Sequence, residues 1–176
     1  MKLKWKKATF KILIGVLLCF SCSANIDSVF EDTQDQNTIE AYDLFLSEYP
    51  DSKYGDEANQ NREKLYYEKV ILVTKSQRSK NVHFRASLYD AYLHAYPKGS
   101  FVSEIETSRE KDWYNTTLSL NTLKAYSSYL AEYPNGQFKE AVEKKHEQIS
   151  YESAKTKNSI QAFDQYLNNY PNGQYV

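Results

Sequence analysis

The side chains of this chain that could carry out acid–base or metal chemistry are few and scattered. Its three histidines are His83, His94 and His146, and none has a partner at the spacing of a metal site. The sequence lacks the HExxH, GxGxxG, phosphate-loop and GxSxG motifs. Asp56 and Glu57 form an acidic pair, but they lie where a helix is expected to begin, and carboxylates stabilise that end of a helix. We therefore predict no enzyme, no cofactor and no metal site.

Both cysteines lie in or beside a basic and apolar leader. Five lysines are followed by the apolar run ILIGVLLCF at residues 12–20, which is typical of a secretory signal peptide and is shorter than the roughly 20 residues that span a membrane. The leader resembles that of bacterial lipoproteins, and the resemblance implies a lipid on Cys22, the first residue of the mature chain. The small Ser21 before Cys22 fits such a cleavage site better than the bulky Leu18 before Cys19. An ordinary cleaved signal peptide and an uncleaved anchor are the alternatives.

The charge balance changes once this leader is set apart. We assign residues 1–21 to the signal peptide and 22–33 to the lipidated cysteine and a short linker. The five leader lysines account for the difference between the formal charge of −1 for the whole chain and −6 for residues 22–176. No cysteine follows Cys22, which excludes disulfides and thiol catalysis from the mature chain. Its mildly acidic charge argues against nucleic-acid binding.

The rest of the chain repeats itself around its prolines. Every proline follows a tyrosine, and the separations between successive prolines are 47, 37 and 37 residues. The pairs are Tyr49-Pro50, Tyr96-Pro97, Tyr133-Pro134 and Tyr170-Pro171. A glycine lies two places after the last three prolines, at Gly99, Gly136 and Gly173, and Ser52 takes that place in the first copy. We predict turns at 49–54, 96–101, 133–138 and 170–175.

Aromatic and leucine residues recur at fixed distances before each proline. They occupy the positions eight, five, four and one residues before it, and another aromatic follows four residues after it. The positions before the proline have the i, i+3, i+4, i+7 spacing of one helix face. This predicts helices at about 38–49, 85–96, 122–133 and 159–170, whose tyrosines and leucines form the core. A second helix should follow each turn, at about 54–73, 101–117 and 138–155.

The residues before three of these helices are typical of helix caps. Asn37-Thr38, Asn121-Thr122 and Asn158-Ser159 offer side-chain oxygens to the first backbone amides. Glu40 and Gln161 lie three residues after Asn37 and Asn158, the spacing of a capping box. Phe84 occupies the matching place in the second copy.

A helix–turn–helix unit of about 37 residues that packs on its neighbours predicts an all-α fold, an α-solenoid over residues 34–176. The last repeat is incomplete, because residue 176 falls one residue into its second helix. Either the chain is a truncated product, or something else covers the apolar face of the last helix.

The segment from Ala41 to Ala58, AYDLFLSEYPDSKYGDEA, carries a specific resemblance. It resembles the tetratricopeptide-like repeats of bacterial envelope proteins, including the families of the outer-membrane barrel-assembly lipoprotein BamD and of the Tol-Pal coordinator. The resemblance covers roughly residues 30–176. It departs from those families in its repeat length of 37 rather than 34 residues and in a ten-residue insertion in the second copy.

This resemblance implies a non-catalytic protein–protein interaction scaffold or adaptor, in outer-membrane assembly or envelope maintenance. We expect an envelope protein as the partner and a membrane attachment through the N-terminal lipid, with the outer membrane as the location. A glycan-binding surface lipoprotein is one alternative. A truncated accessory subunit or remnant of a larger envelope protein is another.

Two stretches differ from the rest of the repeats in their charge. The insertion carries basic residues and no acid between positions 69 and 89, and its side chains are Lys69, Lys75, Arg78, Lys80, His83 and Arg85. The stretch from Asp27 to Glu57 has ten acidic residues and only one lysine, Lys53. We name the basic residues as the candidate partner-binding site. The alternative is a solvated loop that folds back on the acidic repeat.

Overall fold

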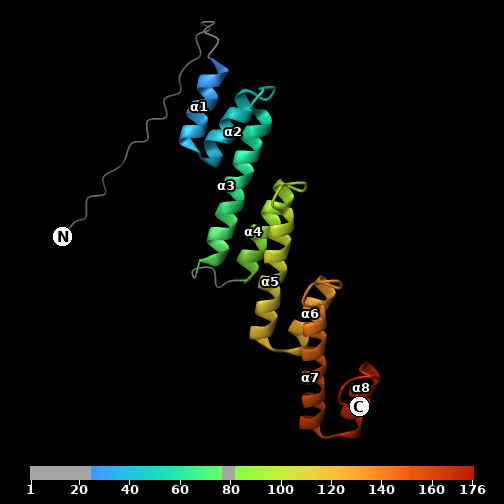
Figure 1. Cartoon of the computed structure of the whole chain (residues 1–176). Coiled ribbons are helices and arrows are strands. Elements are labelled where there is room, and N and C mark those ends of the chain that lie inside the picture. Colours follow the sequence, from blue (N-terminus) through green and yellow to red (C-terminus); the bar gives the residue numbers. More distant parts are fainter. Residues whose placement is uncertain (1–24, 77–81) are drawn as a thin grey trace, which may run out of the picture.

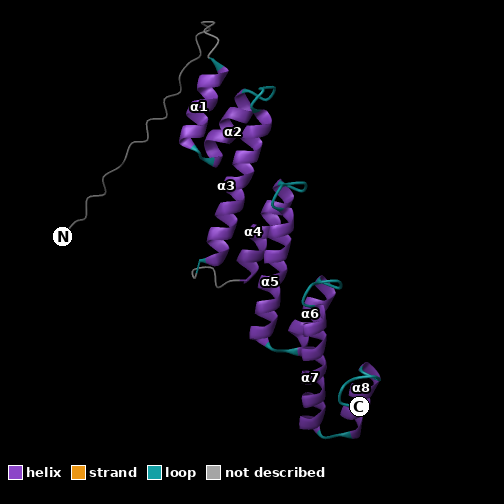
Figure 2. Cartoon of the chain, in the orientation of Figure 1, coloured by secondary structure: helices purple, strands orange, loops and turns teal. Residues whose placement is uncertain are grey.

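The computed structural model describes residues 25–76 and 82–176, and the described residues form eight helices and no strand (Figure 2). The all-α prediction is confirmed. The helices are α1 (Ile26–Gln36), α2 (Ile39–Glu48), α3 (Gly55–Lys75), α4 (Val82–Ala95), α5 (Val102–Leu120), α6 (Leu123–Glu132), α7 (Lys139–Lys157) and α8 (Ile160–Asn169).

The helices run up and down and descend stepwise from α1 to α8, so that the described part of the chain is elongated (Figure 1). Within the described residues, every pair of helices in substantial contact is adjacent in the sequence. The buried side chains accordingly form three separate clusters along the array rather than one central core. They are centred on Phe45 between α2 and α3, Tyr92 between α4 and α5, and Tyr129 between α6 and α7.

Each Tyr-Pro pair lies at the end of a shorter helix. Tyr133 ends α6, because the residue before a proline is disfavoured in the helical conformation. The Gly136 N–H then donates to the Tyr133 carbonyl at 3.1 Å, which closes a tight turn before α7 begins. The equivalent bond from Ser52 to Tyr49 is also 3.1 Å. These segments therefore act as structural joints between helices.

The asparagines that were expected to cap the shorter helices instead end the helices before them. Asn37, Asn121 and Asn158 have positive φ angles of 45°, 47° and 43°, in the left-handed region that asparagine tolerates better than most residues. Thr38, Thr122 and Ser159 are the N-caps, and their side chains accept from the third amide of the next helix. The expected capping boxes from Asn37 and Asn158 are therefore wrong.

The linker predicted at 22–33 also needs correction, since residues 26–33 belong to α1. The Asn25 side chain caps this helix by accepting from the Asp27 N–H at 3.1 Å. Phe30, which is 3% exposed, stacks on the Tyr54 ring with centroids 4.3 Å apart. The Tyr54 hydroxyl donates to Asp27 at 2.6 Å. An aromatic anchor thus makes the first helix part of the array.

That stacked pair recurs in each later copy. The aromatic four residues after each proline lies nearly parallel to an aromatic of the preceding long helix. The later pairs are Tyr67–Phe101, Tyr114–Phe138 and Tyr151–Tyr175, with interplanar angles of 12°, 5° and 2°. All 16 tyrosines lie within the described residues, and none of them is exposed. The tyrosine pattern is therefore a packing pattern.

A glutamate on each of the three long helices α3, α5 and α7 joins that helix to the next short helix and its turn. In the third copy, the Tyr129 hydroxyl donates to Glu110 at 2.5 Å. A Cβ added to Gly136 would lie 2.3 Å from the Glu110 carboxylate, so only glycine leaves room for it. The equivalent sets are Glu63 with Tyr92 and Gly99, and Glu147 with Tyr166 and Gly173. We call each set a Glu–Tyr–Gly contact.

The electrostatics of this contact keep the tyrosine as the donor. Burial, reinforced by the hydrogen bond to Glu147, raises the pKa of Tyr166 to about 12. Burial and the neighbouring glutamate also raise the pKa of Tyr92 and of Tyr129. Glu147 accepts a second hydrogen bond from the Gln174 N–H at 2.6 Å. The Glu147 carboxylate therefore holds both α8 and the turn that follows it against α7.

The first copy lacks all three members of the contact at once. Ile26 stands in the place of the glutamate, Phe45 in the place of the tyrosine and Ser52 in the place of the glycine. Without a carboxylate, the turn has room for a side chain and the aromatic ring needs no hydroxyl. The three positions thus change together.

A second polar contact links each of the long helices α3, α5 and α7 to the short helix before it. Arg62 pairs with Asp43 at 2.8 Å, and Arg109 pairs with Asp90 at 2.9 Å. In the last copy His146 stands in the place of the arginine and Ser127 in the place of the aspartate, with 2.9 Å between Ser127 Oγ and His146 Nε2. The His146 Nδ1 atom contacts the Tyr170 hydroxyl. Burial lowers the pKa of His146.

We predict that Gly136→Ala destabilises the chain by about 1–3 kcal/mol, because the new methyl group displaces a part-buried carboxylate from its hydrogen-bond donors. Gly55→Ala is the matched control. Its Cβ would lie 3.7 Å from the Pro50 carbonyl oxygen, an ordinary contact, at the first position of α3. Urea unfolding followed by circular dichroism measures both variants. Equal losses in the two variants would contradict the close-approach argument.

The natural replacement in the first copy supplies a rescue. Gly136→Ser alone should destabilise, whereas adding Glu110→Ile and Tyr129→Phe should recover part of the lost stability. Coupling is expected because the three side chains are in contact. Additive losses in the triple variant would show that the three positions are independent.

We predict that stability decreases as the pH is lowered, and that part of this decrease depends on His146. Since the folded pKa lies below the ordinary value of 6.5, the unfolded chain binds a proton that the folded chain resists. The contribution is therefore present above pH 6.5 and is lost as pH falls through the lower folded pKa. Unfolding midpoints at about pH 7.5 and pH 5.5 measure it. His146→Gln should reduce the difference, and an unchanged difference would refute the assignment.

Candidate functional site

The regular array is broken between α3 and α4. Seven residues after the stacked aromatic, helices α1, α5 and α7 end at an asparagine, but α3 has Thr74 at that place and continues to Lys75. Helix α4 has 14 residues, whereas α2, α6 and α8 each have 10. The insertion therefore adds one helical turn, Val82–Arg85, to the start of α4.

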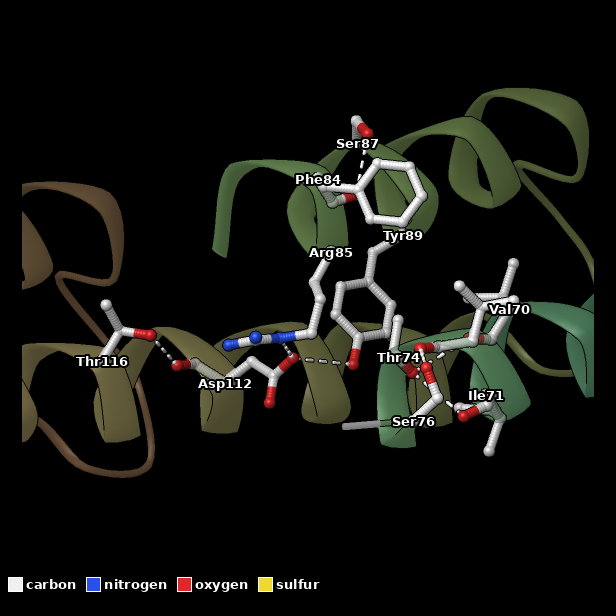
Figure 3. Close-up of polar contacts among 11 residues, drawn as sticks. Val70, Ile71, Thr74, Ser76, Phe84, Arg85, Ser87, Tyr89, Asp112 and Thr116 are labelled. Atoms are coloured by element: carbon white, nitrogen blue, oxygen red, sulfur yellow. Dashed lines mark hydrogen bonds and ion pairs between the residues drawn. The ribbon is translucent and has the colours of Figure 1, made fainter. Parts of the chain in front are cut away.

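On one side of the break, local side-chain hydrogen bonds satisfy backbone carbonyls at the end of α3. Thr74 Oγ1 donates to the Val70 carbonyl at 2.9 Å, and Ser76 Oγ donates to the Val73 carbonyl at 2.9 Å (Figure 3). The Ser76 N–H also donates to carbonyls of the last turn. These bonds replace the left-handed asparagine of the other copies.

An ion pair fixes the added turn of α4 onto α5. The guanidinium of Arg85 lies beside Asp112, with 2.7 Å between Nε and Oδ2, and the Tyr89 hydroxyl donates to the same oxygen at 3.1 Å (Figure 3). The side chains of Arg85 and Asp112 are 16% and 29% exposed. Burial raises the pKa of Tyr89, which keeps its hydroxyl a donor. The turn is therefore held in one place.

A cleft of about 240 Å³ opens where the added turn meets α5 and α6. Its apolar walls are Val82 of α4 and Trp113 and Leu120 of α5. The remaining lining residues are His83, Thr116, Thr117, Thr122, Lys124, Ala125 and Ser128. No acidic residue is among the described lining residues. We call this site the α4–α6 cleft.

A smaller and more polar cleft occupies the equivalent place in the next copy, 37 residues further along. It measures about 110 Å³ and lies between α7 and α8. Ser150 stands where the first cleft has Trp113, and Lys157 stands where it has Leu120. The α4–α6 cleft is thus distinguished by its apolar wall and by the added turn of α4.

The described basic residues of the insertion lie in different places. Lys69 and Lys75 are exposed on α3, Arg85 is paired with Asp112, and His83 lines the α4–α6 cleft. Arg78 and Lys80 lie outside the described residues, as does Cys22. Among the predicted residues that the structure describes, His83 alone lines the cleft.

Trp113, Leu120 and Lys124 were missed as site residues. The sequence held a signal for two of them. Trp113 and Leu120 are apolar, whereas the residues 37 positions later, Ser150 and Lys157, are polar. Lys124 carries no such signal, since it looks like an ordinary exposed helix residue.

We predict that Asp112→Ala lowers the stability by about 1–2 kcal/mol, because it removes a part-buried carboxylate that accepts from both the Arg85 guanidinium and the Tyr89 hydroxyl. The double variant Arg85→Ala with Asp112→Ala should lose less than the sum of the two single variants. Urea unfolding provides the measurement. Removing the exposed ion pair of Lys144 with Glu140 is the control and should have little effect, since water screens it. Equal effects of the two pairs would contradict the prediction.

Two features that often mark a function are absent from the described residues. Within residues 25–76 and 82–176, no group of three or more histidine, cysteine or acidic side chains could hold a metal ion. In the same part of the chain, no helix combines the length and apolar character needed to cross a membrane. No protein-family model and no curated protein matches the sequence.

Proposed function

We propose that the chain is an α-solenoid of tetratricopeptide-like repeats that acts as a non-catalytic protein–protein interaction scaffold. The substantial contacts between described helices all join neighbours in the sequence, which supports the solenoid assignment. The stacked aromatic pairs and the Glu–Tyr–Gly contacts, which recur from copy to copy, support it as well. Such an array presents an extended surface, which suits the binding of another protein.

The α4–α6 cleft is the observation that carries the scaffold proposal. It lies at the break in the repeat, its wall is apolar, and an ion pair holds the turn that borders it. The acidic side chains most protected from solvent elsewhere are committed to structural contacts, as Glu63 is with Tyr92 at 2.6 Å. A function in binding therefore fits the distribution of side chains better than catalysis does.

The proposed location rests on the leader sequence. We place the chain in a bacterial cell envelope, attached to the outer membrane through a lipid on Cys22, with an envelope protein as its partner. Mass spectrometry for a diacylglycerol on Cys22 tests the anchor. An unmodified Cys22, or cleavage at another residue, would remove this part of the proposal.

The alternative of glycan binding has less support. Sugar-binding sites use exposed aromatic faces, but the tyrosines of this chain are all buried or half-buried. Phe84 is an exposed aromatic, at 48%. The glycan alternative would need exposed aromatics gathered in one place, and the protein scaffold does not.

The test is photo-crosslinking from inside the cleft. A photoreactive phenylalanine analogue at Ser128 lines the α4–α6 cleft, and the same analogue at Gln165 occupies the equivalent place in the smaller cleft. We expect Ser128 to yield one major protein adduct in the native envelope and Gln165 to yield much less. The partner, once identified and purified, should bind the full chain and should bind the Leu120→Lys variant at least tenfold more weakly. Equal adducts at both sites, or polysaccharide adducts alone, would overturn the scaffold proposal.

A further inference from the structure

The size of the α4–α6 cleft restricts what it can hold. Small-molecule sites usually measure about 300–1,000 Å³. The cleft, at about 240 Å³, falls below that range and matches one bulky side chain rather than a cofactor or a sugar chain. Its walls of Val82, Trp113 and Leu120 favour an apolar side chain.

The charges around the cleft restrict the neighbours of that side chain. Its described lining includes Lys124 and His83 and no acid. Asp112, which lies behind the added turn, is paired with Arg85 at 2.7 Å. The rim is therefore positive or neutral, and it complements a negative ligand.

Helix ends add to this positive character. Val82 and His83 begin α4, and Lys124 lies in the first turn of α6, so two helix N-termini face the cleft. The C-terminus of α5 at Leu120 opposes them with a partial negative charge, and the Asn121 N–H caps its Thr117 carbonyl. The α6 end is capped by Thr122 and the α5 end by Asn121, so their opposite partial charges largely offset each other, and the start of α4 leaves a net attraction for carboxylates.

We propose that the α4–α6 cleft binds an acidic segment of a partner protein that inserts one bulky apolar side chain, flanked by aspartate or glutamate. The proposal deepens the scaffold function and rests on it. Burial against Trp113 and Leu120 supplies affinity, and Lys124 with the start of α4 selects the flanking charge. The equivalent cleft of α7 and α8 is also basic, through Lys157, but lacks the apolar wall and should not bind the segment.

Two variants separate the apolar requirement from the charge requirement. Leu120→Lys introduces the lysine that the next copy has at the equivalent position, Lys157. It adds positive charge and removes part of the apolar wall. Lys124→Glu reverses the charge and keeps the wall. Leu118→Lys is the control for the first variant, because Leu118 is 36% exposed on the same helix and does not line the cleft.

The experiment is a selection from a random peptide display library on the purified full chain, followed by affinity measurements on the enriched peptides. We expect enrichment of a bulky apolar residue with neighbouring acidic residues. Leu120→Lys should weaken these peptides at least tenfold, Lys124→Glu at least fivefold, and Leu118→Lys less than twofold. Binding should also weaken with added salt.

Several results would overturn the proposal. No enrichment, enrichment of basic or purely polar peptides, or tighter binding by Leu120→Lys would each do so. A lipid that co-purifies with the full chain and is lost in Leu120→Lys would assign the cleft to a lipid chain instead.

The two proposals fail separately. If Ser128 crosslinks to an envelope protein through a segment without acidic residues, the acidic-segment inference fails and the scaffold stands. If neither Ser128 nor Gln165 gives a protein adduct in the native envelope, the scaffold fails, whatever peptides the selection yields.

Discussion

A carboxylate held between two helices and a turn is the constraint on which the described array depends. Glu63, Glu110 and Glu147 each accept a tyrosine hydroxyl from the next helix, over sequence separations of 29, 19 and 19 residues. A charge in such a place is tolerable only when donors surround it. This requirement explains why the buried ring is a tyrosine rather than a phenylalanine and why the turn carries a glycine. The first copy, which has no such glutamate, has neither. One polar group therefore determines residue types at positions far from it in the sequence.

The sequence predicted the aromatic positions and the helices well, because their spacing repeats with the packing. Counting back from each proline identified the buried face of the short helices. It did not identify the glutamate as a repeated position, because the insertion places Glu63 ten residues further from its proline than Glu110 and Glu147 are from theirs. Counted from the stacked aromatics Tyr67, Tyr114 and Tyr151, the glutamate is four residues earlier in every case. Asparagine was harder to assign, because it stabilises a helix start through its side chain and a helix end through its left-handed backbone.

The site was predicted less well than the fold, and the reason is that charge in a sequence does not indicate exposure. Arg85 contributed to a basic stretch, yet Asp112, 27 residues away, neutralises it in the folded chain. The walls of the α4–α6 cleft come largely from α5, well beyond the insertion that creates it. The position of the insertion was visible in the sequence, whereas the surface that it completes depends on which helix the added turn meets.

An array held by contacts between neighbours can accept such an addition without losing its packing. The added turn lies at the start of α4, whereas Tyr92, which donates to Glu63, and the turn at Gly99, which lies against Glu63, are at its other end. Lengthening the helix therefore leaves the Glu–Tyr–Gly contact of that copy intact. In a nearly one-dimensional structure, stability is close to a sum of local and nearest-neighbour terms, so a change in one connection has little effect on distant copies. The connection between α3 and α4 is thus a place where new surface can be built at low cost in stability, and the α4–α6 cleft is that surface.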